Sequence, residues 1–216
     1  LMTSNYFSYH NNFSDLVDPI HEHWGDIWQL KNYNRETWCW NDNIFTHDEL
    51  KKIIKIGNRF GLSKSTIQSN EDPGEYRKSK VSWLTPNSLT SWIYERLTKC
   101  IIENNDKFFQ YDISHIERIQ FTYYNSNNEG CYKKHIDPLN NNSFFNRKLS
   151  MVLQLSNPDE YEGGELKLHT SEDPVLIKKQ KGYLVTFPSH TLHEVTPVTK
   201  GERYSLVAWV HGKLLR

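Results

Sequence analysis

Residues 115–124 read HIERIQFTYY, and from this stretch onward the chain follows a period of two. Alternation of this kind is the pattern of a β-strand with one buried face. Further stretches of the same kind, separated by Asn-rich and Gly-containing loops, are 131–137, 148–156, 165–169, 174–178, 183–187, 192–198 and 203–210. Eight short strands predict an antiparallel double-stranded β-helix, or jelly roll.

Two helices are expected before these strands. Thr46-His47-Asp48-Glu49 forms a capping box, and apolar residues follow it at helical spacing before Gly61: Leu50, Ile53, Ile54, Ile56 and Phe60. A second helix is expected over Ser88–Phe108, with an apolar stripe of Trp92, Ile93, Leu97, Ile101 and Ile102. The predicted class is α+β, mainly β, with a jelly roll backed by N-terminal helices.

The chain is expected to form one domain over residues 1–216. Residues 1–112 supply helical and irregular support, and 113–216 form the jelly-roll core. The first 45 residues hold Trp24, Trp28, Trp38 and Trp40. Because disordered tails usually lack large aromatic residues, we expect this segment to lie over the core with short strands of its own.

Composition excludes some classes of protein. Lys and Arg together number 26, as do Asp and Glu, so no net charge attracts nucleic acid or an anionic membrane. The short basic run Arg77–Lys80 is interpreted as solvated surface. Three cysteines (Cys39, Cys100, Cys131) lack metal-type spacing. Without an apolar run of about 20 residues, no membrane span is predicted, and a cytoplasmic location is expected.

His135, Asp137 and His193 are candidate metal ligands. His135 and Asp137 are two positions apart on one predicted strand, so they share a face while Ile136 points away. If 131–137 and 192–198 pair, His193 joins them. Two imidazoles and one carboxylate are the ligand set of non-haem iron sites with open positions. Among ten histidines, however, a single His-X-Asp is a weak signal.

Arg203 adds a second element. It follows His193 by ten residues, across a predicted turn at Thr199–Gly201, so a hairpin would place it on the neighbouring strand. There its guanidinium would lie too far away to touch the metal but could bind the far carboxylate of a dicarboxylic acid. An exposed ion pair at a strand edge is the alternative interpretation.

The stretch Gln120–Trp209 resembles the iron(II)/2-oxoglutarate-dependent oxygenases, specifically their prolyl 4-hydroxylase-like branch of bacterial and phage type. The resemblance is carried by separate blocks in the correct order: Gln120–Tyr124, Gly130–Asp137, Leu149–Pro158, Tyr161–Leu166, Gly182–Ser189, His193–Val198, Gly201–Arg203 and Trp209. About ninety residues are covered. Residues 77–83 resemble these proteins more loosely.

This resemblance implies a role for each matching residue. His135, Asp137 and His193 would ligate Fe(II), and Arg203 would hold the C5 carboxylate of 2-oxoglutarate. Three aromatic residues also match the family: Tyr124 beside 2-oxoglutarate, Tyr132 near the substrate and Trp209 close to the site. For these three, core packing is the alternative. Gln154 falls where some relatives have a cosubstrate-binding tyrosine, which leaves its own contact with 2-oxoglutarate open.

The implied reaction is hydroxylation of a C–H bond with Fe(II), 2-oxoglutarate and O₂, releasing succinate and CO₂, with ascorbate as a further reductant. The branch suggests a prolyl residue in a peptide or protein as substrate. The alternatives are a free amino acid or small metabolite, or a jelly-roll binding module without catalysis. No nucleic-acid partner and no membrane are expected, and the location would be the host cytoplasm if the chain is phage-encoded. The oligomeric state stays open.

Overall fold

The computed structural model describes residues 35–66, 74–137 and 145–213. Its helices are α3 (His47–Arg59), α4 (Ser91–Asn104), the π-helical turn η2 (Asn105–Phe109) and the 3₁₀ turns η3 (Ser126–Asn128) and η4 (Pro158–Glu160). The described strands are β1 (Cys39–Asn41), β2 (Ser63–Lys64), β3 (Lys80–Leu84), β4 (Ile113–Ile116), β5 (Ile119–Asn125), β6 (Tyr132–His135), β7 (Phe145–Gln154), β8 (Tyr161–Gly163), β9 (Leu166–Leu168), β10 (Val175–Leu176), β11 (Leu184–Pro188), β12 (His193–Val195) and β13 (Val198–Lys213).

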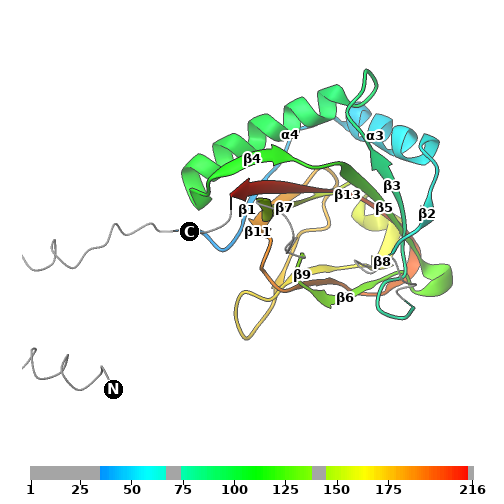
Figure 1. Cartoon of the computed structure of the whole chain (residues 1–216). Helices are drawn as coiled ribbons and strands as arrows, with labels where there is room; N and C mark the ends of the chain where they lie inside the picture. The colour runs from blue at the N-terminus through cyan, green and yellow to red at the C-terminus, as the bar shows by residue number, and fades with distance from the viewer. Residues whose placement is uncertain (1–34, 67–73, 138–144, 214–216) are drawn as a thin grey trace, which may run out of the picture. The chain divides into compact units, whose positions relative to one another are not determined.

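The strands form two sheets. The larger is nine-stranded, in the order β1-β11-β7-β13-β5-β3-β2, with β4 and β8 also paired to β13. The smaller has the order β10-β9-β12-β6. In Figure 1, α3 and α4 cover the face of the larger sheet that is turned away from β6 and β9. This arrangement confirms the predicted jelly roll backed by helices.

Alternation along the central strands separates two apolar cores. On β7, Leu149, Met151 and Leu153 point to the helices and join the core around α3 and α4. The intervening Val152 belongs to a second core with residues of the smaller sheet, such as Leu168 and Val195. Since successive side chains of a strand face opposite sides, each central strand serves both cores, and its inner face is turned to the space between the sheets.

The capping box begins α3 as predicted. The backbone N–H of Thr46 donates to Glu49 Oε2 (2.7 Å), and the Glu49 N–H donates to Thr46 Oγ1 (3.3 Å). These two bonds satisfy donors that the first helical turn leaves free. Leu50, Ile53 and Ile56 are buried against the sheet.

The second predicted helix is shorter than expected. It begins at Ser91 because Asn87 and Thr90 form a side-chain-bonded turn before it, in which the Leu89 N–H donates to Asn87 Oδ1 (2.8 Å). It ends in η2, where Asn105 bonds the backbone of Tyr111. Ile102, expected in the apolar stripe, is exposed instead.

Two strand predictions are wrong in detail. Residues 115–124 form two strands, β4 and β5, which both pair with β13 and are separated at residues 117–118. The turn expected at Thr199–Gly201 is also absent. Instead, β13 runs continuously from Val198 to Lys213 in the larger sheet, whereas β12 belongs to the smaller one. Arg203 is therefore not on the strand next to His193.

Part of the sequence predictions falls outside the described residues. Trp24 and Trp28 are among the residues that the structure does not describe. The assignment of residues 1–216 to a single domain therefore stays a prediction. The cysteines are buried free thiols. Neither α3 nor α4, nor any other helix in the described ranges, has the length and hydrophobicity to cross a membrane.

Candidate metal centre

The three predicted ligands converge. β12 and β6 are antiparallel neighbours, and their register places His193 opposite His135. Asp137 follows β6 directly and is fixed by a bond from its N–H to Ser189 O (3.0 Å). One ligand atom of each residue lies within 4.8 Å of the others, all three residues are buried, and Ile136 between two of them is exposed. The predicted face-sharing is confirmed.

Both histidines present the nitrogen that a metal needs. His135 Nδ1 lies 2.7 Å from Lys133 O, and His193 Nδ1 lies 2.8 Å from Thr191 O. Because a carbonyl oxygen can only accept, each Nδ1 carries the proton and each Nε2 keeps its lone pair. Burial, together with the nearby His193, lowers the pKa of His135 from 6.5 to about 4. The imidazole is therefore neutral at physiological pH, which is the ligating form.

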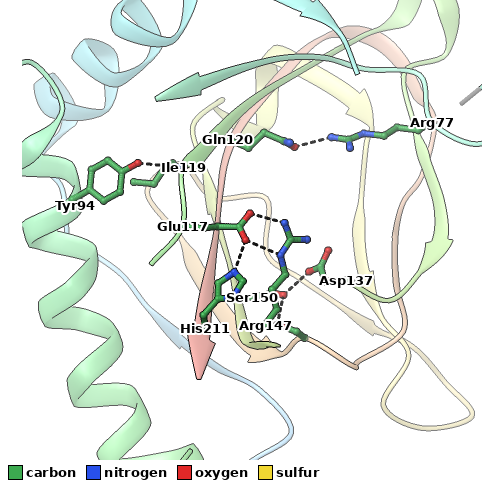
Figure 2. Close-up of polar contacts among 10 residues, drawn as sticks. Arg77, Tyr94, Glu117, Ile119, Gln120, Asp137, Arg147, Ser150 and His211 are labelled. Carbon is green, nitrogen blue, oxygen red and sulfur yellow. Dashed lines mark hydrogen bonds and ion pairs between the residues drawn. The ribbon is translucent and has the colours of Figure 1, made fainter. Parts of the chain in front are cut away.

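The donor set fits one divalent cation. His193 Nε2 lies 3.8 Å from Asp137 Oδ2. With metal–ligand bonds of about 2.1 Å, neighbouring ligands on one ion are about 3.0–3.4 Å apart, so closure on an ion needs side-chain movements of up to about 1–2 Å. The hydroxyl of Ser150 on β7 donates to the same Asp137 oxygen, Oδ2, and also contacts Ser189 Oγ at 3.0 Å. Figure 2 shows the Ser150–Asp137 contact.

Arg203 lies in the same cavity as the three ligands. The cavity, of about 420 Å³, opens between the two sheets, and His135, Asp137, His193 and Arg203 all line it. Arg203 is 1% exposed, and no carboxylate in the described ranges forms a salt bridge with it. Its bonds go to neutral groups, Gln154 Oε1 (3.0 Å) and Ser205 Oγ (3.4 Å). A buried guanidinium without a counter-ion strongly favours binding an anion.

The aromatic candidates also lie at the cavity. Tyr124 is buried with its ring 5.3 Å from the Arg203 guanidinium, and burial raises the pKa of its hydroxyl. The Tyr132 ring stacks on that of His135 with centroids 3.5 Å apart. Trp209 faces the cavity from β13. Gln154 contacts Arg203 rather than a metal ligand.

Sequence reasoning missed Arg77 and Gln120. The interpretation of Arg77–Lys80 as solvated surface is wrong for two of these residues. Arg77 is 8% exposed and lines the cavity, and Ser79 is buried. Arg77 donates to Ser79 Oγ (3.0 Å) and to Gln120 Oε1 (2.7 Å; Figure 2), and its guanidinium lies 4.5 Å from the centroid of the Tyr132 ring. No local sequence pattern indicated either residue, because Arg77 and Gln120 are 43 positions apart.

One side of the cavity, called the charged wall below, is formed by Glu117, Arg147, Trp209 and His211. Of these residues, only Trp209 was predicted from the sequence. Arg147 donates to both carboxylate oxygens of Glu117 (2.5 and 3.0 Å), and His211 Nε2 lies 2.6 Å from Oε2 (Figure 2). The Arg147 guanidinium also lies 3.9 Å from the Trp209 ring centroid. Although burial raises the pKa of Glu117, the bonds from His211 and Arg147 outweigh it and lower that pKa below its usual 4.5. The carboxylate is ionised.

Comparison with known proteins shows which family has a similar sequence in this region. Residues 119–211 match the profile of the 2OG-Fe(II) oxygenase superfamily. The likeness to this superfamily is therefore shown for that part of the chain. The matched range contains all three candidate ligands and Arg203, and the resemblance stated from the sequence is confirmed. The similarity of residues 119–211 to this superfamily implies Fe(II), 2-oxoglutarate and O₂, and His135, Asp137 and His193 are the possible iron site.

Individual relatives point to the same oxygenase branch. A PKHD-type hydroxylase of Teredinibacter turnerae is 39% identical over 89 residues, which span 39% of each chain. The alignment therefore covers about two fifths of that relative's length. A PKHD-type hydroxylase of Crocosphaera subtropica is 28% identical over 177 residues, covering 79% of this chain and 77% of the relative.

The fold is shared with a solved prolyl hydroxylase. The protein, from Trichoplax adhaerens, was solved in complex with a peptide fragment of the oxygen degradation domain of hypoxia inducible factor. It superposes with a TM-score of 0.68 at 19% identity, covering 89% of this chain and 90% of that one. At this identity, the likeness concerns the fold.

Proposed function

We propose that this 2OG-Fe(II) oxygenase hydroxylates a prolyl residue in a peptide or protein, consuming 2-oxoglutarate and O₂ and releasing succinate and CO₂. The observation that carries the proposal is the cavity in which His135, Asp137 and His193 face a buried Arg203 that lacks a carboxylate partner. In this proposal the first three residues hold Fe(II), and Arg203 holds the distal carboxylate of 2-oxoglutarate. Ascorbate is the proposed auxiliary reductant.

Three protein ligands leave part of the iron's coordination shell open for 2-oxoglutarate and O₂. When bound, iron with these two molecules supplies the oxidising power, and the protein supplies position and shielding. The carbonyls behind the two histidines hold each ring with Nε2 toward the ion, and the Ser150 hydroxyl holds Asp137. Tyr132, stacked on His135, restricts that ring further.

The proposed substrate position is the charged wall and the adjoining Trp83. Trp83 and Trp209 have centroids 6.1 Å apart, and both line the cavity. Flat aromatic faces favour contact with a pyrrolidine ring, and the fixed guanidinium of Arg147 is a donor for a peptide carbonyl. The Trichoplax enzyme, which has the same fold, was solved with a peptide. These observations support a peptide over a free metabolite.

The proposal is tested with peptides and a matched histidine control. Purified protein with Fe(II), 2-oxoglutarate and ascorbate is incubated with an array of proline-containing peptides, and each peptide is examined for a gain of one oxygen by mass spectrometry. We expect hydroxylation by the wild type, none by His135→Ala or Asp137→Ala, and normal turnover by His190→Ala, since His190 is exposed and lies outside the cavity.

The same assay separates the alternatives. Hydroxylation of free proline but of no peptide would replace the peptide substrate with a small metabolite. If Fe(II) and 2-oxoglutarate bind but no oxygen is added to any proline compound, the prolyl assignment fails. A protein that binds neither would be a binding module. The complete ligand set and the buried Arg203 argue against that outcome.

A further inference from the structure

A second guanidinium at the cavity, that of Arg77, also lacks a carboxylate partner. Arg77 precedes β3 in the sequence, is 8% exposed and lines the cavity. Within the described ranges it donates only to neutral oxygens, Ser79 Oγ and Gln120 Oε1 (Figure 2), and forms no salt bridge. Arginine keeps its positive charge in proteins, and a buried charge without a counter-ion costs free energy. A ligand that brings a negative charge would remove this cost.

The acidic side chains that line the cavity have other partners. Glu117 accepts two hydrogen bonds from Arg147, so these two charges offset each other. Asp137 belongs to the metal centre. In the proposed function, the charges of Fe(II), Asp137, the doubly negative cosubstrate and Arg203 sum to zero. The positive charge of Arg77 is therefore left over, and the substrate is the remaining molecule that can offset it.

Arg77 and Gln120 offer two donors on the same side of the cavity. Gln120 Oε1 accepts from Arg77 Nη2 (2.7 Å) and from Thr122 Oγ1 (3.2 Å), which fixes the side-chain amide. Arg77 Nη1 and the Gln120 amide nitrogen donate to no residue that the structure describes, and neither atom is sealed off by protein. Both side chains line the cavity. A carboxylate can accept from both donors at once.

The sheet places these donors beside the proposed substrate position. Gln120 on β5 is the register partner of Trp83 on β3. Side chains of directly opposite residues lie next to each other on one face of a sheet. Trp83 also lies next to Trp209 of the charged wall, with ring centroids 6.1 Å apart. A substrate that contacts the two tryptophans is therefore adjacent to Gln120 and, through it, to Arg77.

Tyr132 sets the distance between Arg77 and the metal centre. The centroid of its ring lies 4.5 Å from the Arg77 guanidinium and 3.5 Å from the centroid of the His135 ring. The two distances together correspond to about two residues of extended peptide. A carboxylate bound by Arg77 would therefore lie within about two residues of a prolyl ring that is presented to the metal.

We infer that Arg77, together with the Gln120 amide, binds a carboxylate of the substrate, so that the preferred prolyl residue has an acidic group close to it. This group is either the side chain of a neighbouring aspartate or glutamate or the terminal carboxylate of a C-terminal proline, because both present the same two acceptor oxygens. Arg77 is thus a specificity-determining residue. The inference rests on the proposed function, since it requires a prolyl substrate in this cavity.

Matched pairs of peptides test the inference on the wild-type protein. The members of one pair differ only in glutamate or glutamine beside proline, and those of the other in a free or amidated C-terminal proline. Protein is loaded with Fe(II) and 2-oxoglutarate without oxygen, and the Kd of each peptide is measured by isothermal titration calorimetry. In one of the pairs we expect the acidic member to bind about tenfold more tightly, the scale of one hydrogen bond between charged groups. The pair that shows this preference identifies the source of the carboxylate.

Variants then assign the preference to Arg77. Arg77→Gln should reduce it to within twofold, whereas Arg77→Lys keeps the charge without the planar fork and should retain part of it. Lys51→Gln is the matched control, because it removes one positive charge from α3, on the helical side of the larger sheet (Figure 1), and should keep the full preference. The Kd of 2-oxoglutarate, read from the visible charge-transfer band, should stay within twofold in all three variants, which also shows that they are folded.

The outcomes separate this inference from the function beneath it. If the wild type hydroxylates prolyl peptides but binds both members of each pair within twofold, or if Arg77→Gln keeps the preference, the inference is wrong and Arg77 only supports the Tyr132 ring. If Arg77→Gln loses 2-oxoglutarate as well, Arg77 belongs to the cosubstrate and the inference is also wrong. If no prolyl compound gains oxygen from protein that binds Fe(II) and 2-oxoglutarate, the proposed function itself fails.

Discussion

Replacing Glu117 by Gln should destabilise the protein by about 2 kcal/mol. The Glu117, Arg147 and His211 side chains are only 23%, 17% and 13% exposed, so their bonds are largely shielded from water. Removing one partner of a fully buried pair costs about 3–5 kcal/mol. The remaining exposure reduces this value, and Gln keeps one acceptor. For a chain of this size, the loss corresponds to a decrease in Tm of about 4–8 °C.

The pKa of Glu117 also predicts how the loss of stability in Glu117→Gln depends on pH. Bonds from His211 and Arg147 lower the pKa of Glu117 in the folded protein below its usual 4.5, despite the opposing effect of burial. The charged carboxylate therefore stabilises the fold above about pH 4.5, and this contribution is lost as the pH falls through the lowered pKa. Because Gln does not titrate, the difference in stability between wild type and Glu117→Gln should be constant near neutral pH and shrink below pH 4.5.

Urea unfolding of a double-mutant cycle is the assay. Glu117→Gln, Arg147→Met and the double variant are measured at pH 7 and at pH 4. At pH 7 we expect the double variant to lose about 2 kcal/mol less than the sum of the single losses, because each single change leaves a charged or polar partner unpaired. Additive losses at pH 7, or a difference from wild type that grows toward pH 4, would refute the reasoning.

Three further outcomes are expected. Ser150→Ala should weaken Fe(II) binding about 10–100-fold, measured by anaerobic titration, because Asp137 loses its supporting hydroxyl; unchanged affinity would contradict this. The Cys39 and Cys100 thiols, whose pKa burial raises to about 12, should resist a thiol reagent in the native protein at pH 8 and react after unfolding; fast native labelling would argue against it. Gly57→Ala should cost about 1–3 kcal/mol in urea unfolding, since a Cβ there would lie 2.3 Å from the Phe121 ring; wild-type stability would contradict the packing.

Local patterns predicted what depends on neighbours in the sequence. The capping box at Thr46 and the alternation on β7 are set by residues a few positions apart, and both are seen. The face shared by His135 and Asp137 follows from the same period of two. Pairing of β6 with β12 was stated as a condition, and the register meets it.

The failures have one physical origin, because they depend on contacts between distant residues. Arg77 is buried since Gln120, 43 positions away, accepts its hydrogen bond, and no local pattern encodes that partner. The chain passes from β12 in the smaller sheet to β13 in the larger one without a hairpin, which periodicity does not reveal.

The claim that one iron ion joins three residues is tested most directly by crystals grown with Fe(II) in the absence of oxygen. The anomalous difference map at the iron edge should contain one strong peak in the cavity, with His135 Nε2, His193 Nε2 and one Asp137 oxygen each about 2.1 Å away. A peak that lacks any of these three ligands, or no peak in protein that is saturated with Fe(II), would contradict the account.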